Sequence, residues 1–120
     1  MEKDDNEEII FEILKGTELR HKEQIVNLVL QRLNVGIERY GHGVRVLDDT
    51  TQYGTENNDW LEMFNEEAGD GIVYIAAKIV EMQKKGKPYD GATVGRLRKA
   101  MSHFVSGYLI VDSVRRENGQ

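Results

Sequence analysis

Apolar residues recur every three or four positions along most of the chain, and this spacing predicts amphipathic helices. Between Thr17 and about Tyr40 the apolar stripe consists of Val26, Val29, Leu30, Leu33 and Ile37. Between Asp59 and about Lys85 it consists of Leu61, Phe64, Ala68, Ile72, Ile75, Ile79 and Met82. From about 92 to 115 a broader stripe contains Val94, Leu97, Met101, Phe104, Val105, Tyr108 and Leu109. The pattern predicts an all-α fold, a helical bundle of about three to four helices.

Capping residues, glycines and the single proline indicate where these helices begin and end. Thr17 can cap the first long helix and Asp59 the second. Residues 84–95, which include Pro88, form a break before the last helix. Residues 41–58 form a polar loop that is unusually long for a compact domain, and loops of that length are usually functional or disordered.

Two segments bear on the number of elements and on assembly. Residues 5–15, which end near Gly16, contain the run EIIFEIL, which fits either a short helix or a strand. The stripe of the last helix is wide enough to bury two sides, which in a chain this small indicates a dimer interface or a larger bundle. We therefore expect oligomerisation to complete the bundle, in a homodimer or homotetramer.

Composition narrows the class of protein. The 120 residues suffice for one domain, and the formal net charge of −5 argues against an open nucleic-acid-binding surface. The absence of cysteine excludes disulfides, thiolate zinc sites and cysteine nucleophiles. The N-terminus is acidic where a signal peptide would be basic, and no apolar run approaches the roughly 20 residues of a membrane span. We expect a cytoplasmic protein that does not bind membranes.

The second long helix carries four carboxylates within nine residues, Glu62, Glu66, Glu67 and Asp70. Glu62, Glu66 and Asp70 follow in steps of four and, at about 100° per residue, lie on the side opposite the apolar stripe. Like charges one turn apart destabilise a helix by a few tenths of a kcal/mol per pair. The carboxylates are therefore either screened by solvent or balanced by a bound cation.

The first long helix carries a polar ladder away from its apolar stripe: Asn27, Gln31, Asn34 and Glu38. Asn is a poor helix former, whereas amides donate and accept hydrogen bonds at once, which suits a nucleobase edge or a buried polar contact. Glu38 stands at the C-terminal end of this helix, where the helix dipole disfavours a carboxylate and a cation would compensate. The ladder fits a base-binding face, an interhelical polar seam or a simple surface.

Together these residues resemble a known family. Glu67 and Asp70 form a Glu-x-x-Asp pair, with Glu38 on the preceding helix, in the segments IERYGHGV and DWLEMFNEEAGDGIVYIAAKI. The arrangement resembles the all-α nucleoside triphosphate pyrophosphohydrolases, the MazG-like enzymes and dimeric dUTPases, and most of all their small phage-type members. The resemblance covers about residues 20–85 and implies that residues 1–120 are a single domain of this kind. It extends to a phage subgroup, the MazZ diphosphohydrolases, which act on dGTP or GTP.

The resemblance implies cleavage of a (deoxy)nucleoside triphosphate to monophosphate and pyrophosphate with Mg²⁺, or Mn²⁺, in the cytoplasm, or in the host cytoplasm if the protein is phage-encoded. Glu66 and Glu67 would be catalytic, and Glu66 or Glu62 would accept the proton of the attacking water. The implied metal ligands are Glu38, Glu66, Glu67 and Asp70. The implied substrate contacts are Asn27, Gln31, Asn34, Tyr74, Lys78 and Arg39, with Arg45 as an alternative cation for a phosphate.

The chain departs from the family pattern on the first long helix. The usual signature there is Glu-Glu-x-x-Glu, and alignment of its last glutamate on Glu38 places Asn34 and Val35 where the paired glutamates stand. This departure favours the alternative function, a non-catalytic helical dimer that acts as an adaptor or regulator through its acidic face. The facing ladder and carboxylates favour the pyrophosphohydrolase.

Overall fold

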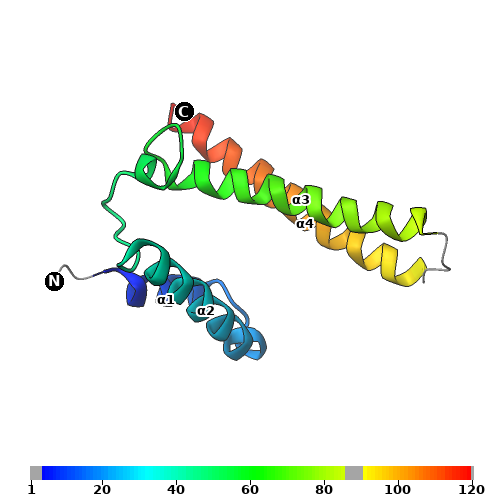
Figure 1. Ribbon diagram of the computed structural model, residues 1–120, viewed down its shortest axis with the longest axis horizontal. Helices are drawn as coiled ribbons and strands as arrows, with labels where there is room; N and C mark the ends of the chain where they lie inside the picture. The colour runs from blue at the N-terminus through cyan, green and yellow to red at the C-terminus, as the bar shows by residue number, and fades with distance from the viewer. Residues whose placement is uncertain (1–3, 86–90, 120) are drawn as a thin grey trace. The chain divides into compact units, whose positions relative to one another are not determined.

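The computed structural model describes residues 4–85 and 91–119 and shows an all-α protein (Figure 1). The described residues form four α-helices and two short 3-10 helices, with no strand among them. The elements are α1 (Asn6–Lys15), η1 (Leu19–His21), α2 (Lys22–Tyr40), η2 (Thr50–Tyr53), α3 (Trp60–Lys84) and α4 (Gly91–Glu117). The all-α prediction is confirmed, and the segment 5–15 forms a helix rather than a strand. The chain divides into two compact units, Met1–Asp48 and Asp49–Gln120, and each is described by itself.

In the first unit α1 packs against α2, and the loop that follows α2 holds the start of α1. The N–H of Asp5 donates to the carbonyl of Val44 at 2.7 Å, and the Asp5 carboxylate accepts from the N–H of Val46 at 2.8 Å. The side-chain oxygen of Asn6 accepts from the N–H of Val44 at 2.8 Å. These bonds join residues about forty positions apart, so the unit is closed by its ends as well as by its helices.

The start of α2 differs from the prediction that Thr17 caps it. The Thr17 hydroxyl donates to the carbonyl of Ile13 at 2.8 Å, so this residue belongs to the end of α1. After η1, α2 begins only at Lys22, and His21 before it provides no side-chain cap. The end of α2 is as predicted: Gly41 adopts φ 80°, a left-handed conformation that costs glycine little, and closes the last turn.

In the second unit a hydrogen-bonded loop anchors the start of α3. As predicted, Asp59 caps α3: its carboxylate accepts from the N–H of Leu61 at 2.9 Å. The same carboxylate accepts from Arg115 Nε at 2.8 Å, which ties the start of α3 to the end of α4. The predicted polar loop 41–58 contains η2, and its residue Thr50 is fully buried. The loop is therefore an organised part of the second unit from residue 49 onward.

Helices α3 and α4 form an antiparallel hairpin (Figure 1). Ala68, Ile79 and Val94 are buried between them at 2%, 6% and 2% exposure, and all three belong to the predicted stripes. Gly71 lies where the ring of Phe104 approaches α3, at 3.2 Å from the position a Cβ atom would occupy. The predicted break 84–95 is shorter on its far side, because α4 begins at Gly91; residues 86–90 lie outside the described residues.

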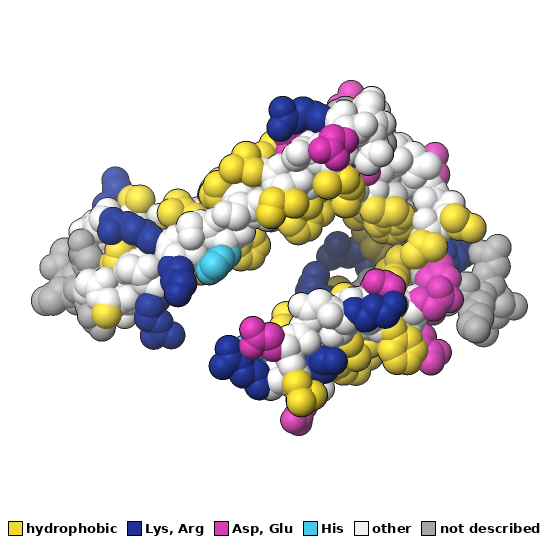
Figure 2. Space-filling view, turned by 180° about the vertical axis from the view of Figure 1, so that it is seen from behind, with side chains coloured by type: hydrophobic (Ala, Val, Ile, Leu, Met, Phe, Trp, Pro, Cys, Tyr) yellow, Lys and Arg dark blue, Asp and Glu magenta, His cyan; other side chains and the backbone are white. Residues whose placement is uncertain are grey.

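Many large apolar side chains of this hairpin are exposed, and Figure 2 shows hydrophobic side chains along its surface. Phe64, placed by the sequence in the core stripe, is 43% exposed. The others are Val73, Tyr74 and Val80 on α3 and Phe104, Val105, Leu109, Ile110 and Val114 on α4. The predicted homo-oligomer remains a prediction. Among the helices that the structure describes, none combines the length and apolar character needed to cross a bilayer.

Candidate functional site: the acidic face of α3

Three of the predicted site residues, Glu66, Glu67 and Asp70, lie together on α3, and we call them the acidic face. All three side chains are exposed. Over four residues α3 rises by about 6 Å, so the three carboxylates are within reach of one small ligand. The described part of the chain places no hydrogen-bond or ion-pair partner beside them. The acidic face is therefore accessible negative charge on one helix.

Glu62, the fourth predicted carboxylate, has a different environment. Its two carboxylate oxygens accept hydrogen bonds from the N–H and the side-chain amide of Asn57, both at 3.0 Å. Arg115 Nη2 lies 3.9 Å from the same carboxylate. The backbone bond from Asn57, then its side-chain bond and, less, the charge of Arg115 hold the pKa of Glu62 below its ordinary value against the opposing effect of burial. Glu62 thus anchors the loop to α3, which leaves Glu66 as the better candidate for a proton acceptor.

Tyr74 and Lys78 continue the same helix toward its C-terminal end. Tyr74 is 68% exposed. Lys78 donates to Glu81 at 2.7 Å, in an exposed ion pair one turn apart on α3. This hydrogen bond and the charge of Lys78, with a further contribution from Lys85, hold the pKa of Glu81 below its ordinary value. Lys78 is accessible, but in this structure it is engaged by a neighbour on its own helix.

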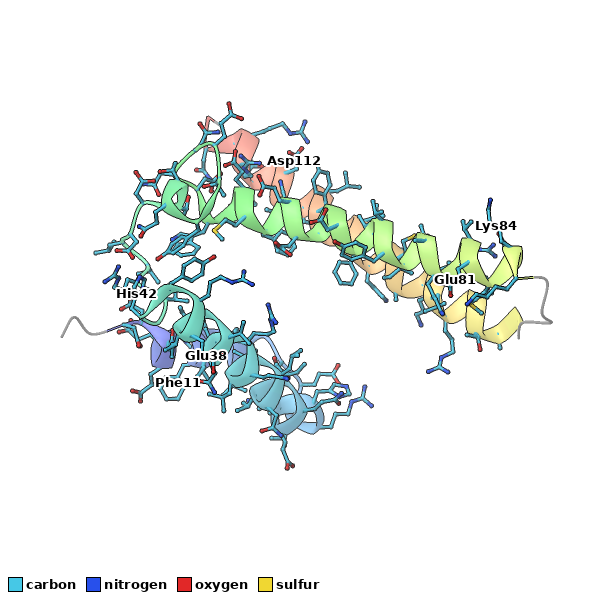
Figure 3. The ribbon with its side chains drawn as sticks, in the orientation of Figure 1. Phe11, Glu38, His42, Glu81, Lys84 and Asp112 are labelled. Carbon is cyan, nitrogen blue, oxygen red and sulfur yellow. The ribbon has the colours of Figure 1, made fainter. Side chains whose placement is uncertain are left out.

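The other predicted site residues belong to the first unit. Glu38 lies on α2 (Figure 3) and is exposed. The polar ladder Asn27, Gln31 and Asn34 and the cation Arg39 are likewise exposed on α2. Arg45, the alternative cation, lies in the loop after α2, where its Nε donates to Asp48 at 2.8 Å and its Nη2 lies 3.0 Å from His42 Nε2. The sequence thus placed its candidates correctly on two helices, which belong to different units.

The residues were tested for a complete metal site. Across residues 4–85 and 91–119, no group of three or more His, Asp or Glu side chains is arranged to hold a metal ion. What α3 does offer is the pair Glu67 and Asp70, three residues apart and therefore adjacent on the helix surface. Two carboxylates are the number that Mg²⁺ commonly takes from a protein when phosphates and waters complete its shell.

The network that positions the acidic face was not anticipated from the sequence. The Thr50 hydroxyl accepts from the N–H of Asp59 at 2.7 Å, and it lies 3.0 Å from the carbonyl of Asn57 and 2.8 Å from the Thr55 hydroxyl. The Thr50 N–H donates to Asn58 Oδ1 at 2.9 Å. The sequence signal was the run of Thr and Asn before Asp59, residue types that hydrogen-bond nearby backbone in turns and caps.

Comparison of the chain with protein-family models, with curated proteins and with solved structures gives no match.

Proposed function

We propose that the protein is a metal-dependent nucleoside triphosphate pyrophosphohydrolase that acts on a (deoxy)nucleoside triphosphate, with dGTP or GTP as candidate substrates. The observation that carries the proposal is the acidic face: Glu66, Glu67 and Asp70 expose three carboxylates on one helix, where their mutual repulsion disfavours the arrangement unless a cation is bound. The resemblance of residues 20–85 supplies the reaction.

The carboxylate pair fits a hard divalent ion. Glu67 and Asp70 would hold Mg²⁺ or Mn²⁺, and phosphate oxygens and waters would supply the other ligands. When bound, such an ion neutralises phosphate charge and lowers the pKa of a coordinated water. Glu38 and the α2 side chains Asn27, Gln31, Asn34 and Arg39 enter the proposal from the resemblance, as a further ligand and as contacts for the nucleotide.

The chain's own side chains have defined roles in this proposal. Glu66, adjacent to the carboxylate pair, would accept the proton of the water that attacks the α-phosphorus. The new P–O bond forms as the bond from the α-phosphorus to the bridging oxygen breaks, and pyrophosphate leaves. Lys78 would exchange Glu81 for a phosphate oxygen, which is feasible because exposed ion pairs contribute little to stability.

The variant Asp70→Asn tests the acidic face directly. It keeps the size of an exposed side chain while removing one charged ligand, so we expect a fold that is unchanged by circular dichroism and turnover at least about 100-fold lower, roughly 2.7 kcal/mol in barrier. Asp112→Asn is the matched control: it is the same substitution on α4, where Asp112 pairs with Arg116 at 3.2 Å, and it should retain wild-type turnover. Wild-type rates in Asp70→Asn would remove Asp70 from the site.

The substrate is identified by measuring pyrophosphate release from the eight common NTPs and dNTPs with Mg²⁺ or Mn²⁺. We expect release with at least one nucleotide and only when the metal is present.

A second candidate function is a non-catalytic helical dimer that acts as an adaptor or regulator. The exposed apolar side chains of the α3–α4 hairpin favour it, because contiguous apolar surface commonly marks an interaction site. Absence of pyrophosphate release from all eight nucleotides with either metal would favour this candidate over the enzyme.

A further inference from the structure

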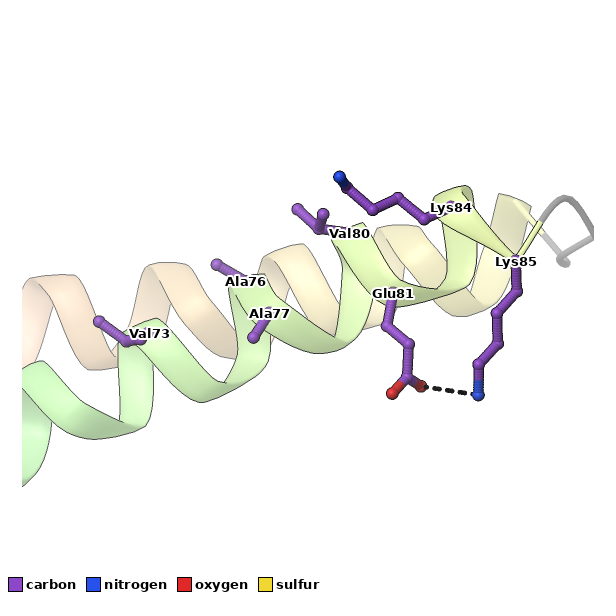
Figure 4. A pocket seen from close by; sticks show the side chains of 7 residues that line it. All are labelled: Val73, Ala76, Ala77, Val80, Glu81, Lys84 and Lys85. Atoms are coloured by element: carbon purple, nitrogen blue, oxygen red, sulfur yellow. Dashed lines mark ion pairs between the residues drawn. The ribbon is translucent and has the colours of Figure 1, made fainter.

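An open apolar groove runs along the C-terminal half of α3, away from the residues that α3 buries against α4 (Figure 4). Its floor is made of small and branched side chains, and charged side chains stand at one end. Val73 and Val80 are 62% and 45% exposed. The lining residues are Val73, Ala76, Ala77, Val80, Glu81, Lys84 and Lys85.

The residues along this groove follow the spacing of a helix–helix seam. Asp70, Val73, Ala77, Val80 and Lys84 succeed one another in steps of three, four, three and four, and we call them the α3 seam. Such a repeat keeps side chains in line along one side of a helix and is the pattern by which two helices pack side by side. The alanines at its middle would allow the two backbones to approach closely.

The charges at the two ends of the α3 seam have opposite signs. Residues 49–77 contain seven Asp or Glu and no Lys or Arg, and the acidic face lies within them. Residues 78–85 contain three Lys and one Glu, Glu81. The seam therefore runs from an acidic end through an apolar middle to a basic end. In an antiparallel pair of identical helices each acidic end lies beside a basic end, whereas a parallel pair would place like charges together.

We propose that the α3 seam is the interface between two copies of this chain, which pack α3 against α3 in antiparallel orientation around a two-fold axis near Ala77. A two-fold axis requires a surface that is complementary to itself, and the charge order of the seam meets that requirement. At about 1.5 Å per residue, Asp70 and Lys84 each lie about 10.5 Å from Ala77, so Asp70 of one copy stands level with Lys84 of the other. The inference does not depend on the proposed function.

Charge reversal tests the interface with two variants. In Lys84→Glu/Lys85→Glu both ends of the seam are acidic, and in Glu66→Lys/Asp70→Lys both ends are basic. Each variant repels itself, and we expect its dimerisation to weaken at least about 100-fold, because like charges across an interface cost several kcal/mol. A mixture of the two variants restores opposite charges at both ends, so we expect a heterodimer to form.

Sedimentation equilibrium at micromolar concentration measures these masses, with circular dichroism to show that each variant is folded. Lys15→Glu/Arg20→Glu is the matched control: it reverses two exposed basic residues of the first unit and should dimerise as the wild type does. A monomeric wild type would overturn the proposal and indicate that another part of the chain, or a different protein, covers the seam. Reversed variants that remain dimeric, or that fail to associate when mixed, would overturn it as well.

Cysteine cross-linking tests the orientation, since the native chain contains no cysteine. Around a two-fold axis at Ala77, Val73 of one copy lies nearly level with Val80 of the other. Two copies of Val73 are offset by about 12 Å along the helix, which is too far for a disulfide. We expect Val73→Cys and Val80→Cys each to stay uncross-linked alone and to form a disulfide-linked dimer when mixed under oxidising conditions. Cross-linking of either variant with itself would contradict the antiparallel arrangement.

Discussion

The buried hydroxyl of Thr50 offers the sharpest test of how the loop anchors α3. It accepts from the N–H of Asp59 at 2.7 Å and lies within hydrogen-bond distance of the Thr55 hydroxyl and the Asn57 carbonyl, at 2.8 and 3.0 Å. Thr55 also lies 2.7 Å from that carbonyl. Each hydroxyl has one proton, so two donated bonds connect Thr50, Thr55 and Asn57, whichever hydroxyl donates to the other.

Thr50→Val preserves the shape of the side chain and removes this hydroxyl. The Asp59 N–H then loses its partner in a buried position, which costs about 1–3 kcal/mol, and the bond network of Thr55 and Asn57 loses about 1 kcal/mol more. We therefore expect the free energy of unfolding to fall by about 2–4 kcal/mol. In a unit of this size each kcal/mol lowers Tm by about 4–8 °C, so Tm should fall by about 10 °C or more.

Urea and thermal unfolding followed by circular dichroism measure this loss. The matched control is Thr51→Val, since Thr51 is exposed and its hydroxyl donates only to the exposed Asp49 at 2.7 Å. We expect that variant to stay within about 0.5 kcal/mol of the wild type. Equal stability of the two variants would refute the reasoning, because it would mean that the buried bonds of Thr50 are replaced by water or are absent.

Two further predictions concern α3. The depressed pKa of Glu62 means that the unfolded chain binds its proton more readily, so this carboxylate contributes stability at neutral pH that is lost as the pH falls below about 4; Glu62→Gln should flatten the acid side of the stability curve, and a curve parallel to that of the wild type would contradict the assigned bonds to Asn57. Gly69→Ala should raise the free energy of unfolding by about 0.4–1 kcal/mol, because a Cβ atom there meets nothing within 4 Å, whereas Gly71→Ala should gain less because the ring of Phe104 lies 3.2 Å from the added atom. An equal gain in urea unfolding for the two alanine variants would contradict the close approach of α4 at Gly71.

The sequence by itself determined the helices and most of their ends. Helical spacing of apolar residues is a local property, so the stripes that contain Ala68, Ile79 and Val94 were identified without the structure, and these residues are the buried apolar ones of the hairpin. The caps at Asp59 and Gly41 were also predictable, because each satisfies backbone groups within its own turn. The acidic face is equally local, since Glu66, Glu67 and Asp70 share one side of a helix through their spacing alone.

Only the tertiary structure decided which polar side chains are engaged and which are accessible. Thr17 is a plausible cap in sequence, yet its hydroxyl bonds back to α1, because the intervening η1 delays the start of α2. Glu62 belongs to the acidic run by spacing, but Asn57 and Arg115 occupy its oxygens, while Glu66 one turn later is exposed. Arg115 lies 56 positions from Asp59, and a contact at that separation depends on how α4 folds back along α3. Periodicity states which side of a helix is apolar; the partner of each polar group is set by packing between segments distant in the chain, and no local pattern specifies it.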